Sequence, residues 1–201
     1  MRTAVELKDL DKVKDDLEDL AREMPHVAVR AINKSLTGVK TDIKAIIRAD
    51  YNYKAGALDK RMTPYKATRA RIEGSIVSKG GAVHLTDIAG TTKGPRGVTV
   101  NVKKSTGRQL IPRAFIAPGK NYNKETGAGK MIVFRRVGDP PGQHAKLVGR
   151  RPIEAFFTGH PEVIMNAPEN WAKIQTAAAQ RLDTNITREI DAEFRRLEGK
   201  W

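Results

Sequence analysis

Apolar side chains recur every third or fourth residue near the C-terminal end of this chain, which predicts one long amphipathic helix. The series comprises Trp171, Ile174, Ala178, Leu182, Ile186, Ile190, Phe194 and Leu197. Asn166, Pro168 and Glu169 are typical of a helix start, and Gly199 is typical of a helix end. A helix of about 30 residues spans roughly 45 Å, more than one small sheet can cover. We therefore expect it to pack on another long helix, on a sheet or on a neighbouring subunit.

Two further helical patterns occupy the N-terminal quarter of the chain. The first is a narrow apolar seam of coiled-coil type, formed by Leu10, Val13, Leu17, Leu20 and Met24. Pro25 follows this seam, and we expect a break or a kink there because proline interrupts helical hydrogen bonding. The second pattern runs from Ala28 to Ile47 and places cations on its exposed side, namely Arg30, Lys34, Lys40, Lys44 and Arg48.

Between residues 51 and 160 the sequence changes to short β-prone runs separated by clusters of Gly, Pro, Asn and Lys. The runs are Arg71–Ser78, Gly97–Lys103, Ala114–Ala117 and Met131–Val137. We predict an α+β fold, with a small and mostly antiparallel β-sheet flanked by long N-terminal and C-terminal helices. We expect one domain over residues 1–201, with a helical part (1–50), a basic β-rich part (51–160) and a C-terminal helix (161–201).

Positive charge is concentrated in the middle of the chain. Residues 1–24 carry −3, residues 25–160 carry +18 and residues 161–201 carry −1, which together give the net charge of +14. So many cations repel one another unless an anionic partner lies opposite them. That partner is a nucleic acid, a membrane surface or an acidic protein surface.

The ends and the composition of the chain limit its location. The N-terminal residues lack the apolar run of a signal peptide, and no stretch reaches the 18 or so apolar residues of a membrane span. The chain has no cysteine, so it forms neither disulfides nor thiolate metal sites. We expect a soluble protein, made in the cytosol and not exported by a cleaved signal.

The motifs that usually mark catalysis are missing from the sequence. The stretch from Gly127 to Met131 resembles a phosphate-binding loop, but Lys124 and Met131 stand where that loop needs Gly and Ser or Thr. The histidines, at positions 26, 84, 144 and 160, show no metal-ligand spacing. The carboxylates of the central region are widely separated, at Asp87, Glu125, Asp139 and Glu154. We expect no enzyme, no cofactor and no metal site.

The densest cations form the candidate interaction surface. It comprises Arg30, Lys34, Lys103, Lys104, Arg108, Arg113, Arg135, Arg136, Arg150 and Arg151. No recognition helix, zinc knuckle or aromatic stacking platform accompanies them, so base-specific recognition is not indicated. These cations either contact phosphates without sequence preference, meet an acidic protein partner, or simply face solvent.

The order of several short motifs resembles the prophage minor tail protein Z family, the tail completion proteins of long-tailed bacteriophages. The matching positions in the helical part are Ala31, Asn33, Lys34, Val39, Lys40, Thr41, Ile47, Arg48, Tyr51 and Asn52. They continue in the β-rich part with Ala114–Ala117, Val133, Phe134, Arg136, Pro152, Ile153, Gly159 and Pro161. The resemblance covers roughly residues 28–165 in patches.

This resemblance implies a non-enzymatic virion protein of the phage neck or upper tail, which acts in tail completion and head-to-tail joining. It implies a ring, often of six copies, whose partners are further copies of the chain and tail terminator, tail tube or head–tail connector proteins. The basic surface would then face acidic ring neighbours or DNA in the channel, and the acidic N-terminal segment of an adjacent copy is one such neighbour. The alternative is an unspecific DNA-binding protein that acts through its basic surface.

Overall fold

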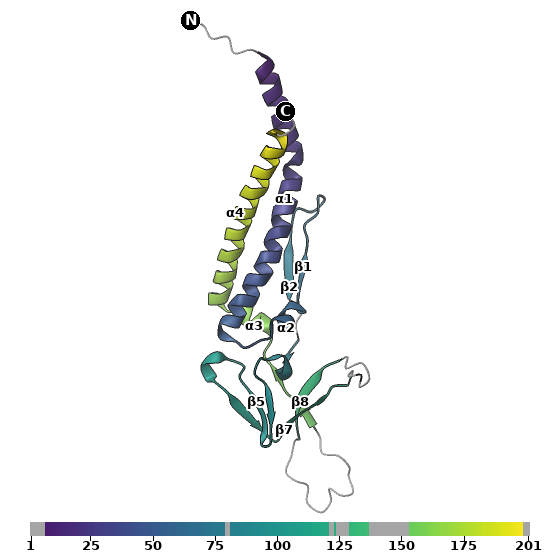
Figure 1. Ribbon diagram of the computed structural model, residues 1–201, viewed down its shortest axis with the longest axis vertical. Helices are drawn as coiled ribbons and strands as arrows, with labels where there is room; N and C mark the ends of the chain where they lie inside the picture. Colours follow the sequence, from purple (N-terminus) through teal and green to yellow (C-terminus); the bar gives the residue numbers. More distant parts are fainter. Residues whose placement is uncertain (1–6, 79–80, 121–122, 124–128, 137–152, 199–201) are drawn as a thin grey trace, which may run out of the picture. The chain divides into compact units, whose positions relative to one another are not determined.

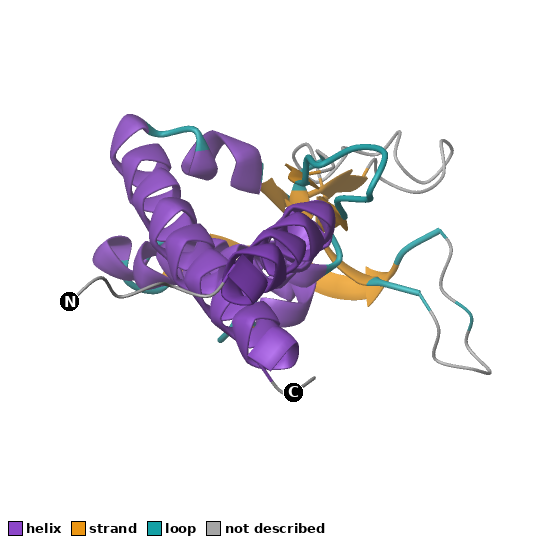
Figure 2. Cartoon of the chain, turned by 90° about the horizontal axis from the view of Figure 1, so that it is seen from above, coloured by secondary structure: helices purple, strands orange, loops and turns teal. Residues whose placement is uncertain are grey.

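The computed structural model describes residues 7–78, 81–120, 123, 129–136 and 153–198. Its helices are α1 (Leu7–Asp50), α2 (Ala55–Asp59), α3 (Pro161–Met165) and α4 (Pro168–Glu198). Its strands are β1 (Met62–Tyr65), β2 (Ser75–Ser78), β3 (Val83–His84), β4 (Thr92–Gly94), β5 (Gly97–Val100), β6 (Gln109–Pro112), β7 (Ala114–Pro118), β8 (Met131–Arg136), β9 (Ile153–Ala155) and β10 (Phe157–Thr158). Figure 2 colours the helices purple and the strands orange.

The chain folds into two compact units. We call the first the helical unit, which comprises Met1–Ile43, Met62–Val77 and Ala172–Trp201. The second is the strand unit, which comprises Lys44–Arg61 and Ser78–Trp171. Each unit is described separately below.

In the helical unit, α1 and α4 lie side by side and run in opposite directions (Figure 1). Their direct hydrogen bonds join residue 42 to 181, residue 35 to 185 and residue 30 to 189, an order that requires an antiparallel pair. The apolar face of α1 forms most of the core of this unit, with Val27, Ala31, Leu36, Val39 and Ile43 buried. Ile174 on α4 is also buried. The long C-terminal helix predicted from the apolar series is confirmed, and another long helix is its neighbour.

A two-stranded ribbon, β1 with β2, completes the helical unit. The side-chain amide of Asn33 on α1 donates to the carbonyl oxygen of Ala67 at 3.1 Å and accepts from its backbone N–H at 2.8 Å. Gly74 allows the ribbon to approach the helix closely, because a Cβ at this position would lie 2.8 Å from Cγ2 of Ile32. One asparagine and one glycine therefore fix this ribbon against α1.

The helix does not break at Pro25, because α1 continues through the proline, whereas the expected kink stays a prediction. A proline inside a helix removes one hydrogen bond and costs about 3 kcal/mol. The residues that follow it offset this cost by packing, since Val27 and Ala31 are almost completely buried. Tertiary packing thus overrides the local preference of proline.

The described residues of the strand unit form three small sheets. They have the orders β4–β5–β6, β7–β8–β9 and β10–β3, and the strands pair antiparallel in each. The core between them is formed by buried side chains, among them Tyr53, Leu58, Val83, Ile88, Val98 and Val133. Tyr53 donates its hydroxyl to the carbonyl oxygen of Gly159 at 3.1 Å, which ties the segment after α1 to the start of α3.

The predicted α+β class is confirmed, with long helices at both ends and small antiparallel sheets between them. Each of the four β-prone runs contains a strand, namely β2, β5, β7 and β8. The strands form several separate sheets where one sheet was expected. The three-part division of one domain stays a prediction. Within the described part of the chain, no helix has the length and apolar content needed to span a membrane.

Candidate functional site

The excess of positive charge belongs to the strand unit. Its residues include 20 Lys and Arg against 8 Asp and Glu, a net charge of +12. The helical unit includes 17 Lys and Arg against 15 Asp and Glu, a net charge of +2. The ten cations of the predicted interaction surface are therefore divided between a nearly neutral unit and a strongly basic one.

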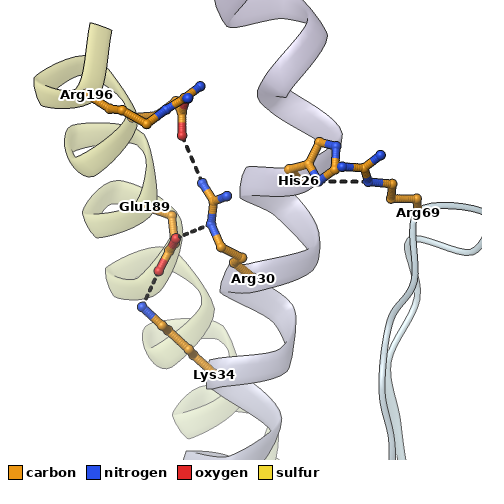
Figure 3. Close-up of polar contacts among 7 residues, drawn as sticks. His26, Arg30, Lys34, Arg69, Glu189 and Arg196 are labelled. Atoms are coloured by element: carbon orange, nitrogen blue, oxygen red, sulfur yellow. Dashed lines mark hydrogen bonds and ion pairs between the residues drawn. The ribbon is translucent and has the colours of Figure 1, made fainter. Parts of the chain in front are cut away.

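Arg30 and Lys34 of the helical unit bind carboxylates of their own chain (Figure 3). Nε of Arg30 donates to Glu189 at 2.7 Å, and its Nη2 donates to Glu193 at 3.0 Å. Lys34 donates to the other carboxylate oxygen of Glu189, and Nε of Arg196 donates to Glu193 at 2.7 Å. These two glutamates are 5% and 3% exposed, so the ion pairs lie in the contact between α1 and α4. We call these five residues the helix charge network.

The helix charge network keeps both glutamates ionised. The hydrogen bond from Lys34 is the main cause of a lowered pKa at Glu189, and that from Arg196 is the main cause of a lowered pKa at Glu193. Burial acts against both shifts, because a desolvated carboxylate is less stable when charged. Arg30 has its pKa raised, chiefly by its hydrogen bond to Glu189. The network therefore serves the pairing of α1 with α4.

Further polar contacts continue along the same helix pair. Ser35 is buried and accepts a hydrogen bond from the side chain of Asn185 at 2.9 Å. The guanidinium of Arg181 donates to both carboxylate oxygens of Asp42, with 2.7 Å for the bond from Nη2. Such directed contacts fix the register of two helices, because a shift by one turn would leave buried polar groups unpaired.

His26 lies on the other side of α1, beside Arg69 of the β1–β2 ribbon (Figure 3). Nε of Arg69 donates to Nδ1 of His26 at 2.9 Å. The bond requires Nδ1 to be unprotonated, since only then can it accept. This contact attaches the loop between β1 and β2 to α1.

The strand unit contains a stretch without any carboxylate. Residues 88–120, which we call the acid-free segment, include seven Lys and Arg and no Asp or Glu. They form β4, β5, β6 and β7 with their connections. The seven cations are all exposed, and they are Lys93, Arg96, Lys103, Lys104, Arg108, Arg113 and Lys120. No ion pair joins any of them to a carboxylate of the described residues.

The acid-free segment presents its cations mainly at the ends of the β4–β5–β6 sheet. Arg96 lies in the turn between β4 and β5, and Arg113 follows β6 at the same end. The backbone N–H of Arg113 donates to the carbonyl oxygen of Arg96 at 3.0 Å. Lys103 and Arg108 flank the short 3₁₀ helix that joins β5 to β6 at the opposite end. The sheet itself keeps Val98 and Val100 in the core.

Two residues at the Arg113 end of the sheet have positive φ angles. Arg113 has a φ of 60°, which is uncommon for a residue with a side chain. Gly97, opposite Pro112, has a φ of 148°, and a Cβ there would overlap the carbonyl oxygen of Ile111. Only glycine fits at this position, so the turn that holds Arg96 beside Arg113 depends on it.

The remaining predicted cations have varied surroundings. Nζ of Lys104 donates to the carbonyl oxygen of Arg48 at 2.7 Å. Arg135 on β8 lies 3.7 Å from the carboxylate of Glu154 and 5.0 Å above the ring of Phe156. Arg136 lies 6.0 Å from the ring centre of Phe115. Arg150 and Arg151 lie outside the described residues.

Sequence reasoning missed two groups of residues. Lys93, Arg96 and Lys120 were not included in the predicted surface, although the absence of Asp and Glu over 33 residues would have indicated them. Glu189 and Glu193 were also missed. Their signal is a pair of acids four residues apart on the apolar face of α4, where a charge needs a partner.

Comparison with known proteins adds no relative: no protein-family model, no curated protein and no solved structure matches this chain. Within the part of the chain that the structure describes, no group of three or more His, Asp or Glu side chains is arranged to hold a metal ion.

Proposed function

We propose that this chain is a structural virion protein of the neck or upper tail of a long-tailed bacteriophage. In this role it acts in tail completion and head-to-tail joining as one subunit of a ring. Its partners would be further copies of itself and tail terminator, tail tube or head–tail connector proteins. It would reside in the host cytoplasm during assembly and in the virion afterwards.

This proposal rests on residues that match the tail completion family, because three of them hold the fold of this chain together. Asn33 binds the β1–β2 ribbon, and Nε of Arg48 donates to the carbonyl oxygen of Tyr53 at 3.1 Å. The side chain of Asn52 donates to the carbonyl oxygen of Asn101 at 2.9 Å. Asn33 and Asn52 bind the backbone of segments 34 and 49 residues away in the sequence, whereas Arg48 binds that of a residue five positions further on. The proposal therefore rests on the resemblance together with the structural role that these residues have in this fold.

Exposed apolar side chains support the role of a subunit. Between residues 153 and 171 four large ones are 46% to 70% exposed, and they are Ile153, Phe157, Val163 and Trp171. Burying such side chains fully contributes roughly 1.5–3 kcal/mol each. These four residues lie within 19 positions of one another in the sequence, and we propose that they belong to a protein interface. Further copies or tail proteins would cover them on assembly.

Val163→Glu is expected to reduce the number of joined, infectious particles by about tenfold or more, because it places a charge in this apolar group. Val163 is 70% exposed, so the free subunit should keep its stability. The measurement is a plaque titre of phage that carry the variant, together with electron microscopy of unjoined heads and tails.

Gln180→Glu is the matched control, because it adds the same charge at an exposed helical position of α4. We expect phage with this variant to assemble normally. A normal titre of phage that lack the chain altogether would contradict the proposed function. Equal effects of the two substitutions would show that the apolar group is not the interface.

A further inference from the structure

The described cations of this chain include some that bind its own carboxylates and others that do not. Arg30 and Lys34 are bound to Glu189 and Glu193 in the helical unit, where they hold two helices together. The cations of the acid-free segment are exposed and have no ion pair among the described residues. The strand unit therefore carries charge that its own described carboxylates do not neutralise.

The arrangement of this charge fits an extended polyanion. Arg96 and Arg113 lie at one end of the β4–β5–β6 sheet, and Lys103 and Arg108 lie at the other. The strand between them, β5, has four residues and is about 13 Å long at 3.3 Å per residue. Duplex DNA carries one negative charge per 1.7 Å or so of its axis, hence roughly eight over this length. Cations at both ends of the sheet can thus contact phosphates of one duplex at the same time.

Composition favours nucleic acid over an acidic protein. Protein–protein interfaces are depleted in lysine, whereas protein–DNA interfaces are much more positively charged. Four of the seven cations in the acid-free segment are lysines, and no carboxylate accompanies them. Exposed hydroxyl groups, such as those of Thr92 and Ser105, stand among them. Ser and Thr hydroxyls are frequent donors to phosphate oxygens.

We infer that the acid-free segment binds the phosphate backbone of double-stranded DNA without base specificity. Contact is made by the exposed cations at both ends of the β4–β5–β6 sheet, chiefly Arg96, Lys103 and Arg108, with Arg113 beside Arg96. Residues 88–120 contain no α-helix that could enter the major groove, so we infer contact with the phosphates and not with base edges. This inference concerns the purified chain and stands apart from its proposed role in a particle.

The experiment measures the affinity of the full chain for a short DNA duplex of mixed sequence, between about 50 and about 200 mM salt. The test variant is Arg96→Gln/Lys103→Gln/Arg108→Gln, which removes three exposed cations without touching the core. Each lost phosphate contact lowers the slope of log affinity against log salt by about 0.9, so we expect a decrease of between about 2 and 3. At about 0.1 M salt this corresponds to a loss of affinity of roughly two to three orders of magnitude.

The matched control is Lys173→Gln/Arg188→Gln/Arg195→Gln. It removes the same charge from three exposed cations of α4 that have no ion pair among the described residues. We expect its salt slope to equal that of the unaltered chain. Equal losses in the two variants would overturn the inference, because overall charge alone would then explain binding.

A second measurement uses polyglutamate in place of DNA, and it tests whether the surface prefers phosphates or carboxylates. We expect DNA to bind at least tenfold more tightly than polyglutamate at the same salt concentration. Failure to bind DNA at low salt, with binding of polyglutamate that depends on Arg96, Lys103 and Arg108, would overturn the inference and assign the surface to an acidic protein. Neither outcome would decide the role of the chain in a particle, which the phage experiment tests.

Discussion

Gly97→Ala is expected to destabilise the strand unit by about 2–4 kcal/mol, through backbone strain and a steric overlap. The new Cβ would overlap the carbonyl oxygen of Ile111 and lie 3.1 Å from the backbone nitrogen of Arg113. Backbone atoms cannot move aside as the end of a flexible side chain can, so β5 and β6 must separate there. The φ of 148° at this residue is in addition accessible almost only to glycine.

Gly94→Ala is the matched control for this prediction. Gly94 pairs with Gly97 in the same hairpin, and a Cβ there would lie 3.7 Å from the nearest atom, which is an ordinary contact. We expect its unfolding free energy to stay within about 0.5 kcal/mol of that of the unaltered chain. Urea unfolding with hydrogen exchange of the β5 amides measures both. Equal stability of the two variants would mean that the turn holding Arg96 and Arg113 adapts easily.

The double substitution Glu189→Gln/Glu193→Gln is expected to destabilise the helical unit by about 2–4 kcal/mol. It keeps the shape of both side chains but removes the charges that Arg30, Lys34 and Arg196 bind. The expected loss is not larger, because Arg30 and Lys34 are 42% and 65% exposed in their side chains and can regain water. Urea unfolding followed by circular dichroism measures it.

Glu73→Gln is the control, since Glu73 pairs with Arg71 in the same unit with both side chains mostly exposed. Exposed ion pairs contribute about 0–1 kcal/mol, so we expect little change. If Glu73→Gln cost as much as the double substitution, burial of the helix charge network would not be the source of its stabilisation.

Acid should weaken the same helix pair. The pKa values of Glu189 and Glu193 are lowered in the folded chain from the ordinary value of 4.5. The stabilisation from a lowered pKa is fully present above the ordinary value and is lost as the pH falls through the folded-state pKa. The unaltered chain should therefore lose stability below about pH 4.5, and the double Gln variant should lose less. Identical pH profiles would contradict this.

Local patterns in the sequence predicted the fold class well. The apolar series from residue 171 to 197 corresponds to α4, and the β-prone run Gly97–Lys103 contains β5. Such periodicities report which side of an element is buried, and each element is encoded within its own stretch. Pro25 shows the limit of local signals, because packing of residues that follow it keeps α1 continuous.

The candidate site was predicted only in part, because charge pairing depends on contacts across long separations in sequence. Arg30 and Glu189 are 159 residues apart, and no local pattern links them. Sequence alone therefore grouped Arg30 and Lys34 with the cations of the strand unit. Lys103, Arg108 and Arg113 of the predicted surface are exposed, and the sequence around them contains no acid.

The two units differ in how their charged side chains are used, which is relevant to the proposed role as a ring subunit. In the helical unit, Arg30 and Lys34 bind buried carboxylates of α4, which stabilises the pairing of α1 with α4. The strand unit leaves the cations of the acid-free segment exposed, together with apolar side chains between residues 153 and 171. We propose that the exposed apolar side chains contact protein neighbours, and we infer separately that the acid-free segment contacts DNA.

A reconstruction of the assembled particle is the most direct measurement of this role. We expect copies of the chain to form a ring at the neck or upper tail, with residues 88–120 of each copy facing the DNA channel. Absence of the chain from purified particles would contradict the proposed function. A ring in which these residues face outward, away from DNA, would leave the function standing and contradict the assignment of the acid-free segment.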